Sequence, residues 1–138
     1  MSFEEKRVWI YAAIAIGVPV VYVVTILGRV REAGVAEVAY VWPMITAIGV
    51  AMVVNMVANM VAGMVSPKEM GKDERDGEIY RHGMRAEFHV LAVGGAAALG
   101  LTMAEFEHFW IANALYLAFV LSALSSSIVK IVAYRRGF

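Results

Sequence analysis

The stretch VWIYAAIAIGVPVVYVVTIL, residues 8–27, carries no charged side chain from one end to the other. A helix of about 20 apolar residues crosses the hydrocarbon core of a bilayer, because each residue adds about 1.5 Å and the core is about 30 Å thick. Backbone groups in lipid must pair within the protein, which leaves helices or closed barrels, and so continuous a run lacks the alternation of barrel strands. This stretch therefore predicts a membrane-spanning helix. No small-residue cleavage site ends it, so we interpret it as a retained helix and not as a removed signal peptide.

Three more stretches of low charge predict three more spans, at about residues 43–65, 86–104 and 109–130. We begin the second at Pro43 because proline is tolerated in the first turn of a helix. The third is the shortest, and Thr102 with Glu105 near its end has the pattern that caps the start of the last helix. The 138 residues, 61% of them hydrophobic, therefore predict a single-domain, all-α integral membrane four-helix bundle with up-down topology.

A charged segment at residues 66–85 separates the two hydrophobic halves. It starts with the capping pattern Ser66-Pro67-Lys68-Glu69 and contains the run KDERDGEIYRH at residues 72–82. No proline interrupts the chain from residue 68 into the third span, so we expect a charged helix that extends this span out of the membrane. Such a helix is either a solvated surface or a docking surface for a cytoplasmic or membrane protein partner. The residues that we expect to contact a partner are Lys72, Asp73, Arg75, Asp76, Glu78 and Arg81.

The lysines and arginines are distributed unequally between the two sides of the predicted bundle. Ten of the twelve fall in the N-terminal, middle and C-terminal segments, whereas the other side carries Arg29 and Arg31 alone. Loops on the cytoplasmic side of a membrane carry the excess of positive charge. The distribution therefore predicts that both termini and the segment 66–85 are cytoplasmic.

Amides and hydroxyls recur at helical spacing within two predicted spans. They are Asn55 and Asn59 in the second span and Asn113, Ser122 and Ser126 in the fourth. Small and amide side chains let membrane helices approach and hydrogen-bond one another, so one interpretation is packing of the second span against the fourth. The other is a polar path for a substrate or an ion. No Asp or Glu lies deep in any predicted span, which disfavours a proton-coupled carrier because such carriers need a carboxylate at depth.

Composition disfavours several functional classes. The chain has no cysteine, which removes disulfides, thiolate metal sites and cysteine nucleophiles. Its formal net charge is zero, without the basic stripe that nucleic-acid binding requires. We find no nucleophile beside a base and no paired carboxylates at depth, so we predict neither an enzymatic activity nor a cofactor.

Two Glu–His pairs, Glu78 with His82 and Glu105 with His108, have spacings that would suit part of a metal site. The alternative interpretations are a solvated helix face for the first pair and acidic residues at a helix N-terminus for the second. We favour these alternatives, because Arg85 would oppose the charge of an ion at the first pair, and the second pair would need a symmetric dimer to complete its ligand set.

Parts of the C-terminal half resemble motifs of a bacterial protein family. They are Lys72-Asp73-Glu74-Arg75-Asp76-x-Glu78-Ile79 and, further on, Trp110-Ile111-Ala112-Asn113, Tyr116 and the ending Lys130-Ile131-Val132-Ala133-Tyr134-Arg135-Arg136-Gly137-Phe138. The family consists of small, uncharacterised four-span membrane proteins that share a domain of unknown function, and some members are encoded beside helix-turn-helix regulators. The resemblance implies a protein of the bacterial cytoplasmic membrane with a regulatory or self-protection role, and it implies no catalytic residues.

The chain also has the length of a small multidrug carrier. Those carriers rely on a glutamate within their first span, whereas residues 8–27 contain no acidic residue. We therefore expect a non-enzymatic accessory or regulatory membrane protein that acts through its charged cytoplasmic segment. The alternative is a small homo-oligomeric transporter or channel with a polar path along the second and fourth spans.

Overall fold

A computed structural model describes residues 2–65 and 73–137 of the chain. All regular secondary structure in these residues is helical, and it confirms the predicted all-α fold with four long helices. The helices are α1 (Phe3–Ala33), α2 (Val41–Val65), α3 (Glu74–Met103) and α4 (His108–Arg136). Each of these four described helices is long and apolar enough to cross a membrane, as expected of a multi-pass membrane protein.

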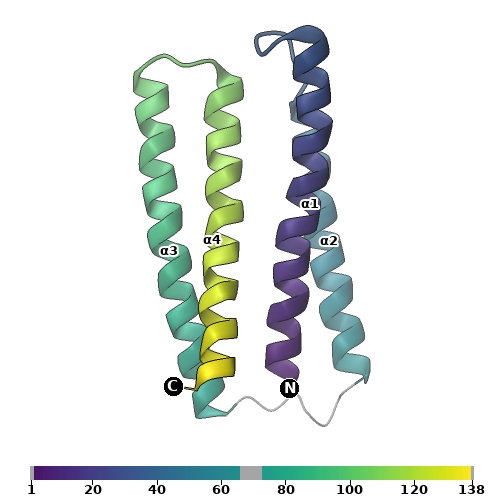
Figure 1. Cartoon of the computed structure of the whole chain (residues 1–138), viewed down its shortest axis with the longest axis vertical. Helices are drawn as coiled ribbons and strands as arrows, with labels where there is room; N and C mark the ends of the chain where they lie inside the picture. Colours follow the sequence, from purple (N-terminus) through teal and green to yellow (C-terminus); the bar gives the residue numbers. More distant parts are fainter. Residues whose placement is uncertain (1, 66–72, 138) are drawn as a thin grey trace.

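The helices pack beside one another in the order α2, α1, α4 and α3 (Figure 1). Contacts are most extensive between α3 and α4, and α1 packs against both α4 and α2. Successive helices run in opposite directions, so both termini lie at one end of the bundle (Figure 1). We call this the terminal end. The opposite end, which carries the loops 34–40 and 104–107, is called the loop end.

Capping residues define where two of the helices begin. Ser2 caps α1, because its hydroxyl accepts a hydrogen bond from the backbone N–H of Glu5 at 3.1 Å. Asp73 and Asp76 form a reciprocal capping box that starts α3. The predicted cap at residues 66–69 lies outside the described residues. From Glu74 onward, the charged segment is a helix continuous with the third predicted span, as expected.

The cap predicted for the last helix is wrong. Thr102 lies within α3, where its hydroxyl donates to the backbone carbonyl of Ala98 at 2.9 Å. α4 begins at His108 after the N-cap residue Glu107, whose side chain makes no capping bond. The difference arises because the chain turns later than expected, at Glu105, which adopts a left-handed backbone conformation with φ of 58°.

Aromatic residues build a core in the half of the bundle nearer the loop end. The buried cluster consists of Tyr22, Ile26, Val38, Ala47 and Phe109. Within it, the hydroxyl of Tyr22 donates to Asn113 Oδ1 at 2.7 Å, and the ring of Tyr22 packs edge-on against that of Tyr116 with centroids 4.7 Å apart. These contacts hold α1 to α4.

Glycines allow α3 and α4 to approach closely. Gly94 lies directly against the side chain of Ala118, and Gly83 lies against the aliphatic stem of Lys130. A Cβ atom added to either glycine would overlap its neighbour. Close approach through small residues is the usual way in which membrane helices pack, since lipid provides no hydrophobic force between them.

Large apolar side chains cover the outside of the described bundle. They come from all four helices and include Val24, Met52, Phe88 and Phe119, each more than half exposed. Contiguous apolar surface on this scale is rare on soluble monomers, because contact with water costs roughly 25 cal/mol per Å². Lipid imposes no such cost, so the surface agrees with four membrane-spanning helices.

Candidate functional site at the terminal end

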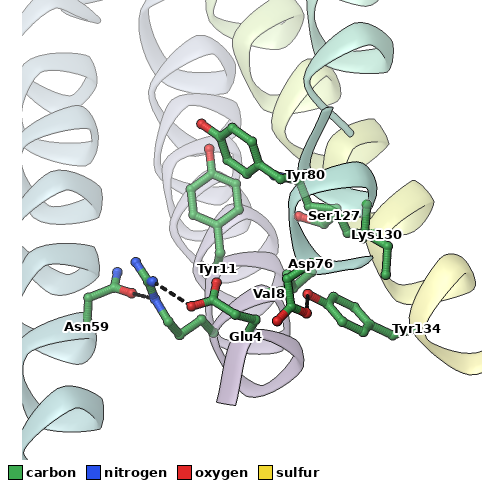
Figure 2. A pocket seen from close by; sticks show the side chains of 11 residues that line it. Glu4, Val8, Tyr11, Asn59, Asp76, Tyr80, Ser127, Lys130 and Tyr134 are labelled. Atoms are coloured by element: carbon green, nitrogen blue, oxygen red, sulfur yellow. Dashed lines mark hydrogen bonds and ion pairs between the residues drawn. The ribbon is translucent and has the colours of Figure 1, made fainter. Parts of the chain in front are cut away.

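A polar pocket of about 150 Å³ lies among the four helices at the terminal end (Figure 2). Its lining includes three tyrosines, two cationic side chains and two carboxylates. The lining residues are Glu4, Arg7, Val8 and Tyr11 of α1, Asn59 of α2, Asp76, Ile79 and Tyr80 of α3, and Ser127, Lys130 and Tyr134 of α4. We call it the terminal-end pocket. Its two cations and two carboxylates leave the lining without formal net charge.

Arg7 connects α1 to α2 at one side of the pocket. Its Nε donates to Asn59 Oδ1 at 2.6 Å, and its Nη1 pairs with the Glu4 carboxylate at 3.2 Å (Figure 2). The amide nitrogen of Asn59 donates to the backbone carbonyl of Asn55 at 2.7 Å. Asn59 is thereby oriented with its carbonyl toward the guanidinium, and hydrogen bonds to a charged group are stronger than neutral ones.

Two interactions hold α4 to α3 and α1 at the other side. The hydroxyl of Tyr134 donates to Asp76 Oδ1 at 2.7 Å (Figure 2), while the backbone N–H of Asp76 donates to Asp73 Oδ1 at 2.7 Å. Glu5 pairs with Arg135 at 3.0 Å, although the side chain of Glu5 is only 10% exposed. Asp76 therefore joins the start of α3 to the end of α4.

Lys130 reaches across the pocket from α4. Its Nζ lies over the ring of Tyr80, 4.8 Å from the ring centroid, in cation–π geometry. Its aliphatic stem covers Gly83. The lysine stem thus packs in the helix interface while the ammonium lies at the pocket, as expected for a long cationic side chain near the end of a span.

The residues predicted to contact a partner separate into two groups. Asp73, Arg75, Glu78 and Arg81 are exposed, whereas Asp76 is half-buried and lies in the terminal-end pocket. Lys72 lies outside the described residues. Arg85 extends the exposed side of α3 by one turn beyond Arg81. We call the set Arg75, Glu78, Arg81, His82 and Arg85 the charged face of α3.

The five residues predicted to form a polar path or packing contact do not lie in one row. Asn59 bonds to Arg7 and Asn113 bonds to Tyr22, both on α1. The hydroxyl of Ser122 donates to the backbone carbonyl of Phe119 at 2.8 Å. α2 and α4 make little direct contact, and α1 joins them instead. Polar residues therefore do connect helices, but through an intermediate helix that the sequence spacing did not indicate.

Two of these path residues have buried oxygen atoms without a hydrogen-bond partner in the described chain: Asn55 Oδ1 and Ser126 Oγ. Ser126 is fully buried. Asn55 borders a mostly apolar groove of about 710 Å³ between α1, α2 and α4. Buried polar atoms normally find a partner, so an unpaired one in a native structure needs an explanation.

The two Glu–His pairs remain isolated. Among the described residues, no group of three or more His, Asp or Glu side chains gathers in a way that could hold a metal ion. In the first pair, Nδ1 of His82 donates to the backbone carbonyl of Glu78 at 2.9 Å, so the short contact is with the main chain. The ring of His82 is exposed, which agrees with a solvated helix face.

Sequence reasoning did not single out Arg7, Tyr134 or Glu87. Arg7 and Asn59 are 52 residues apart, and no local pattern indicates their pairing. Tyr134 and Asp76 are 58 residues apart. Glu87 does have a local signal, because it lies four residues after Gly83 and seven before Gly94, on the same helix face.

No family model matches the chain, and neither a curated protein nor a solved structure matches it. The resemblance to small four-span bacterial membrane proteins therefore stays a prediction.

Proposed function

We propose that this chain is a non-enzymatic accessory or regulatory membrane protein that binds a partner protein through the charged face of α3. The observation that carries the proposal is the continuity of α3. A row of exposed charges, from Arg75 to Arg85, stands on the same unbroken helix as a candidate membrane span. A partner bound to these charges would therefore act directly on a helix of the membrane bundle.

The opposite side of the same turns supports this role. Asp76 bonds to Tyr134, and Tyr80 packs against Lys130, so the first turns of α3 are held to α4. A surface held in place loses less conformational entropy on binding than a free segment does. The mixed charges of Arg75, Glu78 and Arg81 favour a partner with a complementary pattern, because charge complementarity selects partners and sets register.

We propose further that the charged face lies in the bacterial cytoplasm, with both termini on that side and an up-down course of the four spans. Among the residues that the structure describes, eight of the ten lysines and arginines belong to the segments at the terminal end, against Arg29 and Arg31 toward the loop end. This imbalance follows the positive-inside distribution of membrane proteins.

A photo-crosslinking experiment tests the docking proposal. A photoreactive phenylalanine analogue replaces His82 on the charged face in the full chain, and the cells are irradiated. We expect a crosslinked product whose second component is one defined protein, identified by mass spectrometry. The same analogue at Ala104, in the loop at the loop end, provides the background.

A charge exchange separates docking from membrane insertion. The double variant Arg75→Glu with Glu78→Arg keeps net charge and composition while it reverses the pattern. The matched control, Arg31→Glu with Glu32→Arg, makes the same exchange at the loop end. We expect the yield of crosslinked product to fall by about tenfold or more in the first variant, which corresponds to a loss of about 1.4 kcal/mol in binding free energy. We expect the control to keep the yield of the parent. Equal crosslinking in the parent and both variants would show that the charged face is only a solvated surface.

A further inference from the structure

A second polar layer lies deeper in the bundle than the terminal-end pocket, by about one helical turn. Its position follows from the register of the helices. On α3 and α4, Lys130 lies against Gly83 and Ala118 lies against Gly94. Because the two helices run antiparallel, one turn from the first pair brings Ser126 level with Glu87. Glu87 is on the helix face that carries both glycines, and it is half-buried.

Tyr11 of α1 belongs to the same layer. The Glu5–Arg135 ion pair and the Tyr22–Asn113 hydrogen bond define the register of α1 on α4. Between these two contacts, Tyr11 falls level with Ser126 and Ser127, and it lines the terminal-end pocket together with Ser127. The carboxylate of Glu87 is close enough to interact electrostatically with the Tyr11 hydroxyl.

Glu87 differs from the other carboxylates around it. Glu4 pairs with Arg7, Glu5 pairs with Arg135, and Asp76 accepts a hydrogen bond from Tyr134. Within residues 2–65 and 73–137, Glu87 has no such ion pair or hydrogen bond. The hydroxyl of Ser126, fully buried at the same level, also has no partner there.

The charges that face this layer come from two neighbouring helices. α1 contributes Tyr11 and, nearer the terminal end, Glu4 and Arg7, and α4 contributes Lys130 one turn away; α2 makes little contact with α3. Together with Glu87 these groups comprise two carboxylates and two cations, and Glu4 already pairs with Arg7. A carboxylate without an ion pair at the edge of a low-dielectric bundle is expensive unless it binds a proton or a cation.

We propose that Glu87, together with the hydroxyls of Tyr11 and Ser126, binds a small hard cation, either a proton or Na⁺, within the bundle. Carboxylate and hydroxyl oxygens are the donors that such cations prefer. Tyr11 lines both the layer and the terminal-end pocket, so the pocket provides the route by which the cation enters. This site is separate from the charged face of α3 and does not depend on the docking role.

Labelling with dicyclohexylcarbodiimide tests the site in the full chain reconstituted in liposomes. This apolar reagent couples to protonated carboxyl groups, and mass spectrometry of the digested protein locates the adduct. We expect Glu87 to be modified faster than Glu32 and Glu37, exposed carboxylates toward the loop end, and the rate to fall as pH rises. Slower labelling in sodium chloride than in choline chloride of equal ionic strength identifies Na⁺ as the cation; equal rates identify the proton. Labelling of Glu87 no faster than of Glu32, or without pH dependence, overturns the proposal.

Two neighbouring serines supply matched variants that conserve the bundle. Ser126→Ala removes the unpaired hydroxyl, whereas Ser127→Ala removes a hydroxyl that already donates to the Ala123 backbone carbonyl. In the proposed site the Ser126 hydroxyl is a hydrogen-bond donor to the Glu87 carboxylate, so its loss leaves that carboxylate more open to the reagent. We expect Ser126→Ala to raise the labelling rate of Glu87 at one fixed pH by about tenfold, and Ser127→Ala to leave the rate unchanged. An unchanged rate in Ser126→Ala, or equal changes in both variants, overturns the role of Ser126.

Discussion

Two asparagines on one face of α2 have different environments despite their identical chemistry. Asn59 is engaged on both ends of its amide, with the Arg7 guanidinium on one side and the Asn55 backbone carbonyl on the other. The Oδ1 atom of Asn55 is buried and unpaired within the described chain. A hydrogen bond to a charged group contributes about 1.5–3 kcal/mol, whereas a buried unpaired polar atom costs free energy. The two residues should therefore respond oppositely to an apolar replacement.

We predict that Asn59→Leu lowers the free energy of unfolding by about 1–2 kcal/mol, because Arg7 loses a partner but keeps Glu4. Asn55→Leu is the matched control on the same helix face, and we expect it to be neutral or stabilising. Denaturant titration in mild detergent micelles, followed by circular dichroism, measures both changes. Equal destabilisation by the two variants would mean that the Arg7–Asn59 bond contributes little to stability.

At the scale of elements, the interface between α3 and α4 depends on backbone approach. Gly94 and Gly95 are neighbours in the same helix, but only the first lies against α4; a Cβ atom at Gly95 would meet open space. Both positions gain helix propensity when glycine becomes alanine, by about 1 kcal/mol. A difference between the two substitutions therefore reports packing and not propensity.

We predict that Gly95→Ala leaves the bundle unchanged or stabilises it, whereas Gly94→Ala lowers the free energy of unfolding relative to Gly95→Ala by about 1–3 kcal/mol, the typical cost of overpacking. The measurement is the same detergent unfolding titration, with hydrogen exchange of α3 and α4 as a local readout. Faster exchange in both helices of Gly94→Ala, and not in α2, would locate the damage. Identical stabilities would indicate that α4 moves away at no cost.

At the scale of the whole molecule, the four helices leave most of their apolar surface on the outside and most of their charges at one end. The orientation proposed above can be measured directly, because the chain has no cysteine. Any cysteine introduced is therefore a unique label. Exposed positions are available at both ends: Ala36 and Ala104 at the loop end, and Glu74 at the terminal end.

The experiment uses cells in which a membrane-impermeant maleimide reaches the outer side of the inner membrane but does not cross it. We predict that Ala36→Cys and Ala104→Cys react with the maleimide in these cells. We predict that Glu74→Cys reacts only after the inner membrane is permeabilised. The two loop-end sites are internal controls for each other, since an even number of spans separates them. Labelling of Glu74→Cys in sealed cells would reverse the proposed orientation. Labelling of one loop-end site alone would contradict the proposed course of the four spans.

The number of helices and their apolar character could be predicted from the amino-acid sequence, because hydropathy and helix length are local properties. The helical continuation of the charged segment into α3 could be predicted as well. The cap predicted for the last helix was wrong, because a capping pattern such as Thr102 with Glu105 fits the interior of a helix as well as its start when the position of the turn is unknown.

The contacts between side chains of different helices could not be predicted in this way. The spacing of Asn55 and Asn59 identified a face of α2, but the partner of Asn59 lies on α1 and not on α4. Asp76 stands in a run of exposed charges yet turns toward Tyr134, and Glu87 lies at the edge of a predicted span yet faces the bundle. These outcomes depend on helix order, rotation and register, which arise from packing between residues far apart in the chain. The spacing of Glu87 from Gly83 and Gly94 indicates a shared face of α3, but it does not indicate which residues of α1 and α4 that face meets.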